Sequence, residues 1–163
     1  MRNKSKINVS RRVHADTQTV WRILADFGGM SKFNPFLSHS ALLGEQSAPK
    51  TCGVGTHRQC DMKVAKLYLR EKIVDWKEGA SYTVHIYESM MPVNELFTTI
   101  GVVPDGAGRS EVHMRSEYVP KFGALGVIMD VLFLRMTMRF MFNRVLKGLE
   151  RFAHRQENAS KTE

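Results

Sequence analysis

The sequence contains few cysteines and lacks the long apolar runs of membrane-spanning proteins. Only Cys52 and Cys60 occur among 163 residues, which is too few for a disulfide framework, and their spacing is not a common metal-binding pattern. The first ten residues, MRNKSKINVS, include no apolar run that could form the core of a signal peptide. The apolar stretch at 123–134 is too short to span a bilayer and is interrupted by Asp130. We therefore expect a reduced, cytoplasmic protein.

Motifs for binding metal ions or phosphate groups are missing as well. The glycines at 28–29 and 53–55 fall at expected turns and not in the strand–loop–helix fingerprint of a nucleotide site. The histidines are scattered and form no HxH or HExxH pair: His14, His39, His57, His85, His113 and His154. We therefore expect neither a metal ion nor a cofactor.

Negative charge is scarce relative to positive charge. The 24 lysines and arginines outnumber the 16 acidic residues, which gives a net charge of +8. The basic residues are spread along the chain and are not gathered in a block, and aromatic residues are not interleaved with them as in a base-stacking surface. We therefore expect no nucleic-acid partner.

The remaining composition is typical of a globular protein. Hydrophobic residues make up 43% of the chain and charged residues 25%, and the length suits one domain with a sizeable core. No shift in composition marks a second domain. We expect a single domain over residues 1–155 and a polar, disordered tail over 156–163.

Apolar spacing along the chain predicts the order of its elements. Residues 6–14 alternate as in a strand, and helical spacing then predicts a short helix from Thr17 and a second one ending before Pro35. Short spacers favour antiparallel neighbours among the strands that follow. These six strands are expected at 37–44, 55–62, 66–76, 81–89, 95–103 and 109–119, and a long helix at 124–154. The pattern predicts an α+β fold in which this helix covers a curved antiparallel sheet.

The long helix carries two apolar stripes. The first contains Val127, Val131, Leu134, Met138, Met141, Phe142, Val145, Leu149 and Phe152. The second lies away from it and contains Met129, Phe133, Met136 and Phe140. A helix that is apolar on two sides buries both or exposes a patch. The second stripe is covered by other parts of the chain, forms the contact of a homodimer, or is a lipid-facing or ligand-entry surface flanked by Arg135 and Arg139.

Several segments together resemble a known family. ADTQTVWRILADF at 15–27, followed by Phe33-Asn34-Pro35, is similar to the opening of bacterial polyketide cyclase/dehydrase-like proteins. GVGTHR at 53–58, LREKI at 69–73 and YVPKFGALG at 118–126 are similar to later parts of the same family, which belongs to the START and birch-pollen-allergen (SRPBCC) superfamily. No single segment is diagnostic, but their order and spacing cover nearly the whole chain.

The resemblance implies a helix-grip fold, in which seven antiparallel strands wrap around a C-terminal helix and enclose an elongated apolar cavity. Members of the superfamily carry lipids, sterols, plant hormones, polyketides or quinones, and some are cyclases. The fold alone does not decide between carriage and catalysis.

Strand alternation predicts which side chains face such a cavity. Tyr82, Val84, Ile86 and Glu88 share one strand face. A one-residue slip in register would reverse these assignments. The complete predicted ligand-binding set is Tyr82, Val84, Ile86, Glu88, Thr98, Ile100, Met114, Tyr118, Met138, Phe142 and Val145. For a catalytic protein, His57 and Glu88 are the acid–base candidates.

The sequence supports three functional hypotheses. The leading one is a non-catalytic carrier or sensor of a small hydrophobic molecule such as a lipid, an isoprenoid or an aromatic polyketide. The second is a cyclase or dehydratase that acts through His57 or Glu88. The third is a protein- or membrane-interaction module that uses the second helix stripe, Met129, Phe133, Met136 and Phe140.

Overall fold

The computed structural model describes residues 4–44 and 52–160. The first elements are β1 (Ser5–Val13), α1 (Thr17–Ala25), the 3-10 helix η1 (Phe27–Lys32), β2 (Leu37–Leu42), β3 (His57–Met62), β4 (Tyr68–Lys77), β5 (Ser81–Glu88), β6 (Val93–Pro104) and β7 (Ser110–Pro120). One continuous helix follows and comprises α2 (Gly123–Met129), the π-helical turn η3 (Asp130–Leu134) and α3 (Arg135–Ser160). Each strand end lies within two residues of the predicted end.

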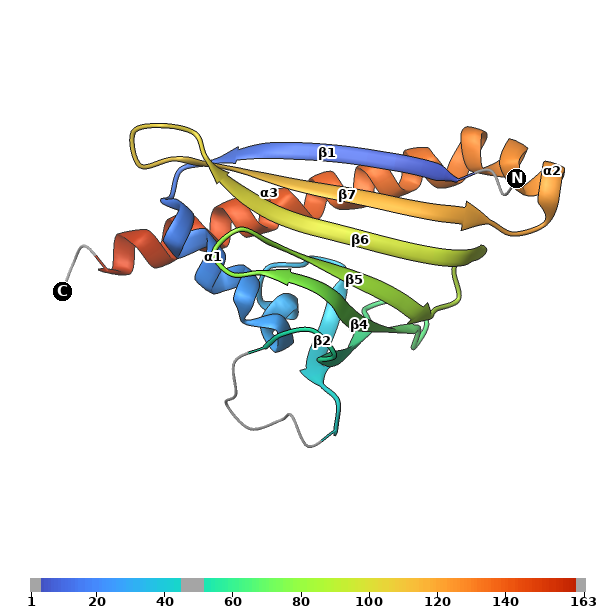
Figure 1. Cartoon of the computed structure of the whole chain (residues 1–163), viewed down its shortest axis with the longest axis horizontal. Helices are drawn as coiled ribbons and strands as arrows, with labels where there is room; N and C mark the ends of the chain where they lie inside the picture. The colour runs from blue at the N-terminus through green and yellow to red at the C-terminus, as the bar shows by residue number, and fades with distance from the viewer. Residues whose placement is uncertain (1–3, 45–51, 161–163) are drawn as a thin grey trace.

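The strands form one antiparallel sheet in the order β1-β7-β6-β5-β4-β3-β2. β2 to β7 follow one another as a meander, and β1 returns to pair with β7. Figure 1 shows that the sheet curves along one side of α3, with α1 next to the C-terminal half of that helix. The predicted α+β architecture, a curved seven-stranded antiparallel sheet with two short helices after β1 and a long C-terminal helix, is confirmed.

Local chemistry fixes the start of α1. The Asp16 carboxylate accepts a hydrogen bond from Thr19 N at 2.8 Å and so caps α1. The inner side of α1 and η1 buries Trp21, Leu24 and Phe27 in the core between the sheet and α3. These helices therefore close one end of the sheet–helix sandwich.

The long helix extends further than the sequence predicts at its C-terminal end. α3 continues to Ser160, so residues 156–160 are helical and the predicted disordered tail is wrong for them. Residues 161–163 lie outside the described part of the chain.

The π-helical turn changes which residues of the long helix face the sheet. Gly126 and Asp130 are buried, Leu134 is half-buried and Met138 is buried, so inward positions recur every four residues instead of every 3.6. The extra residue in the turn rotates the segment before it relative to α3. Val131, predicted on the inner stripe, is therefore exposed.

Candidate ligand cavity

A cavity of about 420 Å³ lies between the concave face of the sheet, η1 and α3. Its wall is mainly apolar, and its size falls within the usual range of small-molecule sites, roughly 300–1,000 Å³. Nine of the eleven predicted ligand-binding residues line it: Tyr82, Val84, Ile86, Thr98, Ile100, Met114, Met138, Phe142 and Val145. Their contact with a ligand stays a prediction.

Glu88, the tenth predicted residue, does not line the cavity. The pairing of β4 with β5 shifts between Arg70↔Glu88 and Glu71↔Ile86, so one extra β5 residue lies in a bulge there. This bulge pairs Glu88 with Arg70, and the Glu88 carboxylate accepts hydrogen bonds from Tyr68 Oη at 2.5 Å and from Arg70 Nη1 at 3.1 Å. The hydrogen bond from Tyr68 is the main cause of the lowered pKa of Glu88.

Tyr118, the eleventh residue, points inward but also lies outside the cavity wall. It is 1% exposed, and its hydroxyl donates a hydrogen bond to the buried carboxylate of Asp130. Burial, together with this hydrogen bond, raises the pKa of Tyr118 to about 12. The Tyr118 side chain therefore joins the sheet to the long helix through its hydrogen bond to Asp130.

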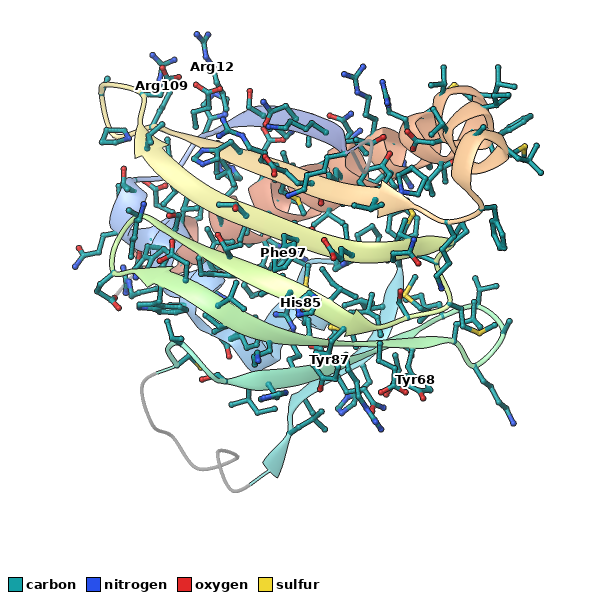
Figure 2. The ribbon with its side chains drawn as sticks, turned by 45° about the vertical axis from the view of Figure 1, so that its right-hand side comes forward. Arg12, Tyr68, His85, Tyr87, Phe97 and Arg109 are labelled. Carbon is teal, nitrogen blue, oxygen red and sulfur yellow. The ribbon has the colours of Figure 1, made fainter. Side chains whose placement is uncertain are left out.

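The candidate acid–base residue His57 lies on the outer face of the sheet. Its Nδ1 is 3.1 Å from Tyr87 Oη, and Tyr87 is on the same outer surface as His85. Figure 2 shows His85, Tyr87 and Phe97 on the face of the sheet turned away from α3. Neither His57 nor Glu88 lies in the cavity wall, so neither is placed to act on a molecule enclosed there.

A buried ion pair in the cavity wall was missed by sequence reasoning. Arg58 on β3 and Glu71 on β4 are directly paired across the strands, and both side chains line the cavity. Arg58 Nε donates to Glu71 Oε1 at 2.6 Å, Arg58 Nη2 donates to the same oxygen, and Arg58 Nη1 donates to the carbonyl of Phe27 at 2.5 Å. Alternation alone could place Arg58 on the strand face opposite to that of His57. Only the pairing of β3 with β4 brings Glu71 next to Arg58.

Neighbouring groups make this part of the cavity wall a compact polar patch. Arg58 lies 3.8 Å from the centre of the Phe27 ring, and the Cys60 thiol donates weakly to Glu71 Oε1 at 4.0 Å. All contacts of Glu71 with Arg58 and Cys60 use Oε1. Glu71 Oε2 is therefore the oxygen of this carboxylate that a ligand donor could use.

Burial determines the protonation of these groups. Burial opposes the charge on Arg58, but attraction to Glu71 outweighs it and the pKa of Arg58 is raised. Burial raises the pKa of the Cys60 thiol from 9.0 to about 12, and that of the Tyr82 hydroxyl from 10.0 to about 12. At neutral pH the patch holds a charged guanidinium, a protonated thiol and a protonated phenol. Cys60 is therefore not an activated nucleophile.

Residues 4–44 and 52–160 contain no cluster of three or more His, Cys, Asp or Glu side chains that could hold a metal ion. Within the same ranges, the helices are too short or too polar to cross a membrane.

A curved antiparallel sheet that grips a long helix over an internal cavity defines the helix-grip class of proteins. The chain belongs to the family described as polyketide cyclase / dehydrase and lipid transport, whose sequence profile matches residues 4–157. No curated protein matches the chain closely enough to count as a relative.

Solved structures share the fold at low sequence identity. A protein from Thermus thermophilus superposes with a TM-score of 0.74 at 16% identity, over 93% of this chain and 99% of that chain. A START superfamily protein from Mycobacterium smegmatis gives 0.73 at 12% identity, over 93% and 98%. Norcoclaurine synthase from Thalictrum flavum, solved with dopamine and hydroxybenzaldehyde, gives 0.69 at 15% identity, over 94% and 88%. At these identities the likeness is one of fold.

Proposed function

We propose that the protein binds and carries one small hydrophobic molecule, of lipid, isoprenoid or aromatic polyketide type, in this internal cavity. The observation that carries the proposal is the mainly apolar wall with one buried polar patch, formed by Arg58, Glu71, Cys60 and Tyr82. Apolar burial provides affinity at about 25 cal/mol per Å² before ordering costs, and a few polar groups fix orientation. The family membership supports a ligand-binding role without naming the ligand.

The charge balance of the patch favours a ligand whose polar group is neutral. The guanidinium of Arg58 is already matched by the carboxylate of Glu71 and by the Phe27 carbonyl. A ligand carboxylate would add a second negative charge beside Glu71 in a poorly solvated space, and that is unfavourable. A ligand hydroxyl can instead donate to Glu71 Oε2, and a ligand carbonyl can accept from an N–H of Arg58.

Native mass spectrometry of the purified protein, followed by denaturation and extraction, tests the proposal. We expect a stoichiometric apolar molecule in the wild type, or uptake of one from a panel of fatty acids, quinones and aromatic polyketides. Ile86→Trp places a large ring in the cavity, whereas Val74→Trp makes a comparable change at an exposed β4 position outside the cavity wall. Binding should be lost in the first variant and kept in the second.

The charge argument has its own pair of probes, 1-dodecanol and dodecanoate, which share a chain length and differ in charge. We expect the alcohol to bind at least tenfold more tightly at pH 8. Wild-type protein that is empty as purified and stays empty with every probe would refute the carrier proposal. Binding of dodecanoate in preference to dodecanol would refute only the neutral-ligand argument.

An enzyme of the cyclase or dehydratase type is the second candidate function. The observation that favours it is the carboxylate of Glu71 in the cavity wall, where a general base is required. Recovery of the bound molecule chemically unchanged after prolonged incubation supports carriage. Conversion of an aromatic polyketide by the wild type, with loss of turnover in Glu71→Gln and retained binding, would support catalysis.

A further inference from the structure

The N-terminal part of the long helix exposes an apolar surface that the fold leaves uncovered. Phe122 is 75% exposed and Met136 is 66% exposed, values expected of polar surface residues. The exposed apolar surface, here called the helix-end patch, consists of Phe122, Leu125, Ile128, Met129, Val131, Leu132, Phe133, Met136 and Phe140. In Figure 1 this segment lies at the end of the molecule opposite α1 and the C-terminus. Contiguous apolar patches of this kind mark interaction surfaces.

The exposed charges that the long helix itself carries beside the helix-end patch have one sign. Between Lys121 and Leu149 the sequence contains five basic residues and a single acidic one, Asp130. The basic residues are Lys121, Arg135, Arg139, Arg144 and Lys147. Asp130 is 1% exposed and forms an ion pair with Arg135 at 3.1 Å, so the positive excess of the segment comes from the other four basic residues. The surface of this segment is therefore apolar and positively charged.

A buried polar cluster holds the exposed segment in place. The Asp130 carboxylate accepts hydrogen bonds from Ser5 Oγ at 2.5 Å, from Tyr118 Oη and from Arg135 Nη2 at 3.1 Å. These contacts tie the π-helical turn to β1 and β7. The helix end is thus anchored through its inner side while its apolar side chains stay outside.

We propose that the helix-end patch docks the protein on the surface of an anionic lipid bilayer. Apolar side chains with basic residues beside them are what an interfacial helix uses, since burial at the headgroup boundary adds to attraction by anionic lipids. A second copy of this chain suits the patch less well. A symmetric pair would bring Arg139 and its neighbours against their own copies, and like charges would oppose the contact.

The helix-end patch adjoins the cavity through the β5–β6 connection. Lys121 N donates a hydrogen bond to Pro92 O at 2.9 Å, and Met90, Met91 and Pro92 line the cavity. On the same helix, Met138 and Met141 line the cavity while Met136 and Phe140 belong to the patch. Docking through the patch would therefore bring one end of the cavity to the lipid surface. The docking inference itself rests on the patch and its charges, independent of what the cavity holds.

Vesicle co-sedimentation of the full chain tests the proposal. The probes are phosphatidylcholine vesicles with and without about 30% phosphatidylglycerol, at low and high salt. We expect binding to the anionic vesicles, weakened by salt, and little binding to the neutral ones. The double variant Phe133→Ser/Phe140→Ser should reduce the partition coefficient at least tenfold, because it removes two apolar anchors.

Matched controls separate binding through the patch from nonspecific hydrophobic binding and from the effect of net charge. Phe97→Ser/Val103→Ser removes two exposed apolar residues from the sheet and should bind as the wild type does. Arg139→Gln should lower binding about fivefold. Arg109→Gln makes the same charge change at the end of the sheet away from α2 (Figure 2) and should have little effect. Thermal unfolding of each variant checks that it is folded.

Three outcomes would overturn the proposal. One is the absence of binding to anionic vesicles by folded wild type. Another is equal loss in the patch variants and their controls. The third is a concentration-dependent dimer, seen by analytical ultracentrifugation, that Phe133→Ser/Phe140→Ser dissociates while vesicle binding is absent. That result would assign the patch to contact between two copies of this chain.

Discussion

At the scale of single residues, the most informative group is the buried pair Arg58 and Glu71. Their side chains are only 2% and 6% exposed, so each charge depends on the other for compensation. A buried pair adds little net stability over an apolar replacement, but removal of one partner leaves an uncompensated charge. Stability therefore gives no reason for the pair in the cavity wall, which agrees with the proposed role of the polar patch in orienting a ligand.

Equilibrium urea unfolding of variants of this pair tests the argument about its stability. Arg58→Met should lower the free energy of unfolding by about 3–5 kcal/mol, because Glu71 stays buried without its partner. Arg58→Met/Glu71→Met should recover most of the loss. Lys6→Met is the control, since Lys6 and Glu117 form an exposed pair at 3.0 Å that should contribute only about 0–1 kcal/mol. A double variant as unstable as Arg58→Met would contradict the argument.

Cys60 gives a second prediction at this scale. Because burial raises the pKa of its thiol from 9.0 to about 12, its thiolate fraction at pH 8 is roughly a thousandfold below that of an ordinary cysteine. In a Cys52→Ser variant, iodoacetamide should modify Cys60 very slowly in the folded protein and readily in urea. Mass spectrometry of the alkylated chain measures both rates. Rapid modification of the folded variant would show that the thiol is accessible and ionised.

At the scale of elements, α3 packs closely against Phe33, the residue that follows η1. A Cβ built on Gly148 would lie 2.0 Å from the carbonyl oxygen of Phe33, a backbone atom that cannot move without shifting η1. Gly148 therefore lets α3 approach the chain segment that carries Asn34, part of the cavity wall. The glycine is explained by this contact, since glycine within a helix is otherwise unfavourable.

Gly148→Ala should consequently destabilise the protein. In an exposed helix the same change stabilises by about 1 kcal/mol. Here we expect a fall in Tm of several degrees, measured by circular dichroism. Thr137→Ala at an exposed position of α3 should leave Tm unchanged or raise it slightly. A Tm for Gly148→Ala at or above that of the wild type would mean that α3 and η1 separate without cost.

Irregularities within elements explain where sequence reasoning failed. Strand alternation predicts Tyr82, Val84 and Ile86 in the cavity wall, and they line it. The same alternation fails at Glu88 because a β-bulge intervenes, and periodicity carries no signal for a bulge. Helical periodicity likewise fails at Val131, since the π-helical turn adds a residue to one turn. To place Arg58 and Glu71 side by side in the cavity wall, the pairing of β3 with β4 must be known, and the alternation within one strand does not predict that pairing.

At the scale of the whole molecule, the fold was predictable because many sequence patterns along the whole chain agree on it. Seven alternating segments and one long helical segment leave few ways to bury apolar surface, and mostly short connections favour a meander for β2 to β7. The size and shape of the cavity were not predictable in the same way. They depend on how side chains such as Met138 and Phe142 fill the space between sheet and helix.

The cavity makes one prediction for the molecule as a whole. A sheet and helix that enclose about 420 Å³ of space forgo packing contacts that a ligand can restore. Ligand that binds only the folded state adds about 2.7 kcal/mol of stability at a hundred times its Kd. We expect 1-dodecanol at that concentration to raise the Tm of the wild type and of Val74→Trp by several degrees, measured by differential scanning calorimetry. Ile86→Trp should show a smaller shift because its ring occupies the site. An equal shift in Ile86→Trp would place the bound alcohol outside the cavity, since alcohol that cannot enter the blocked cavity cannot stabilise the protein from there.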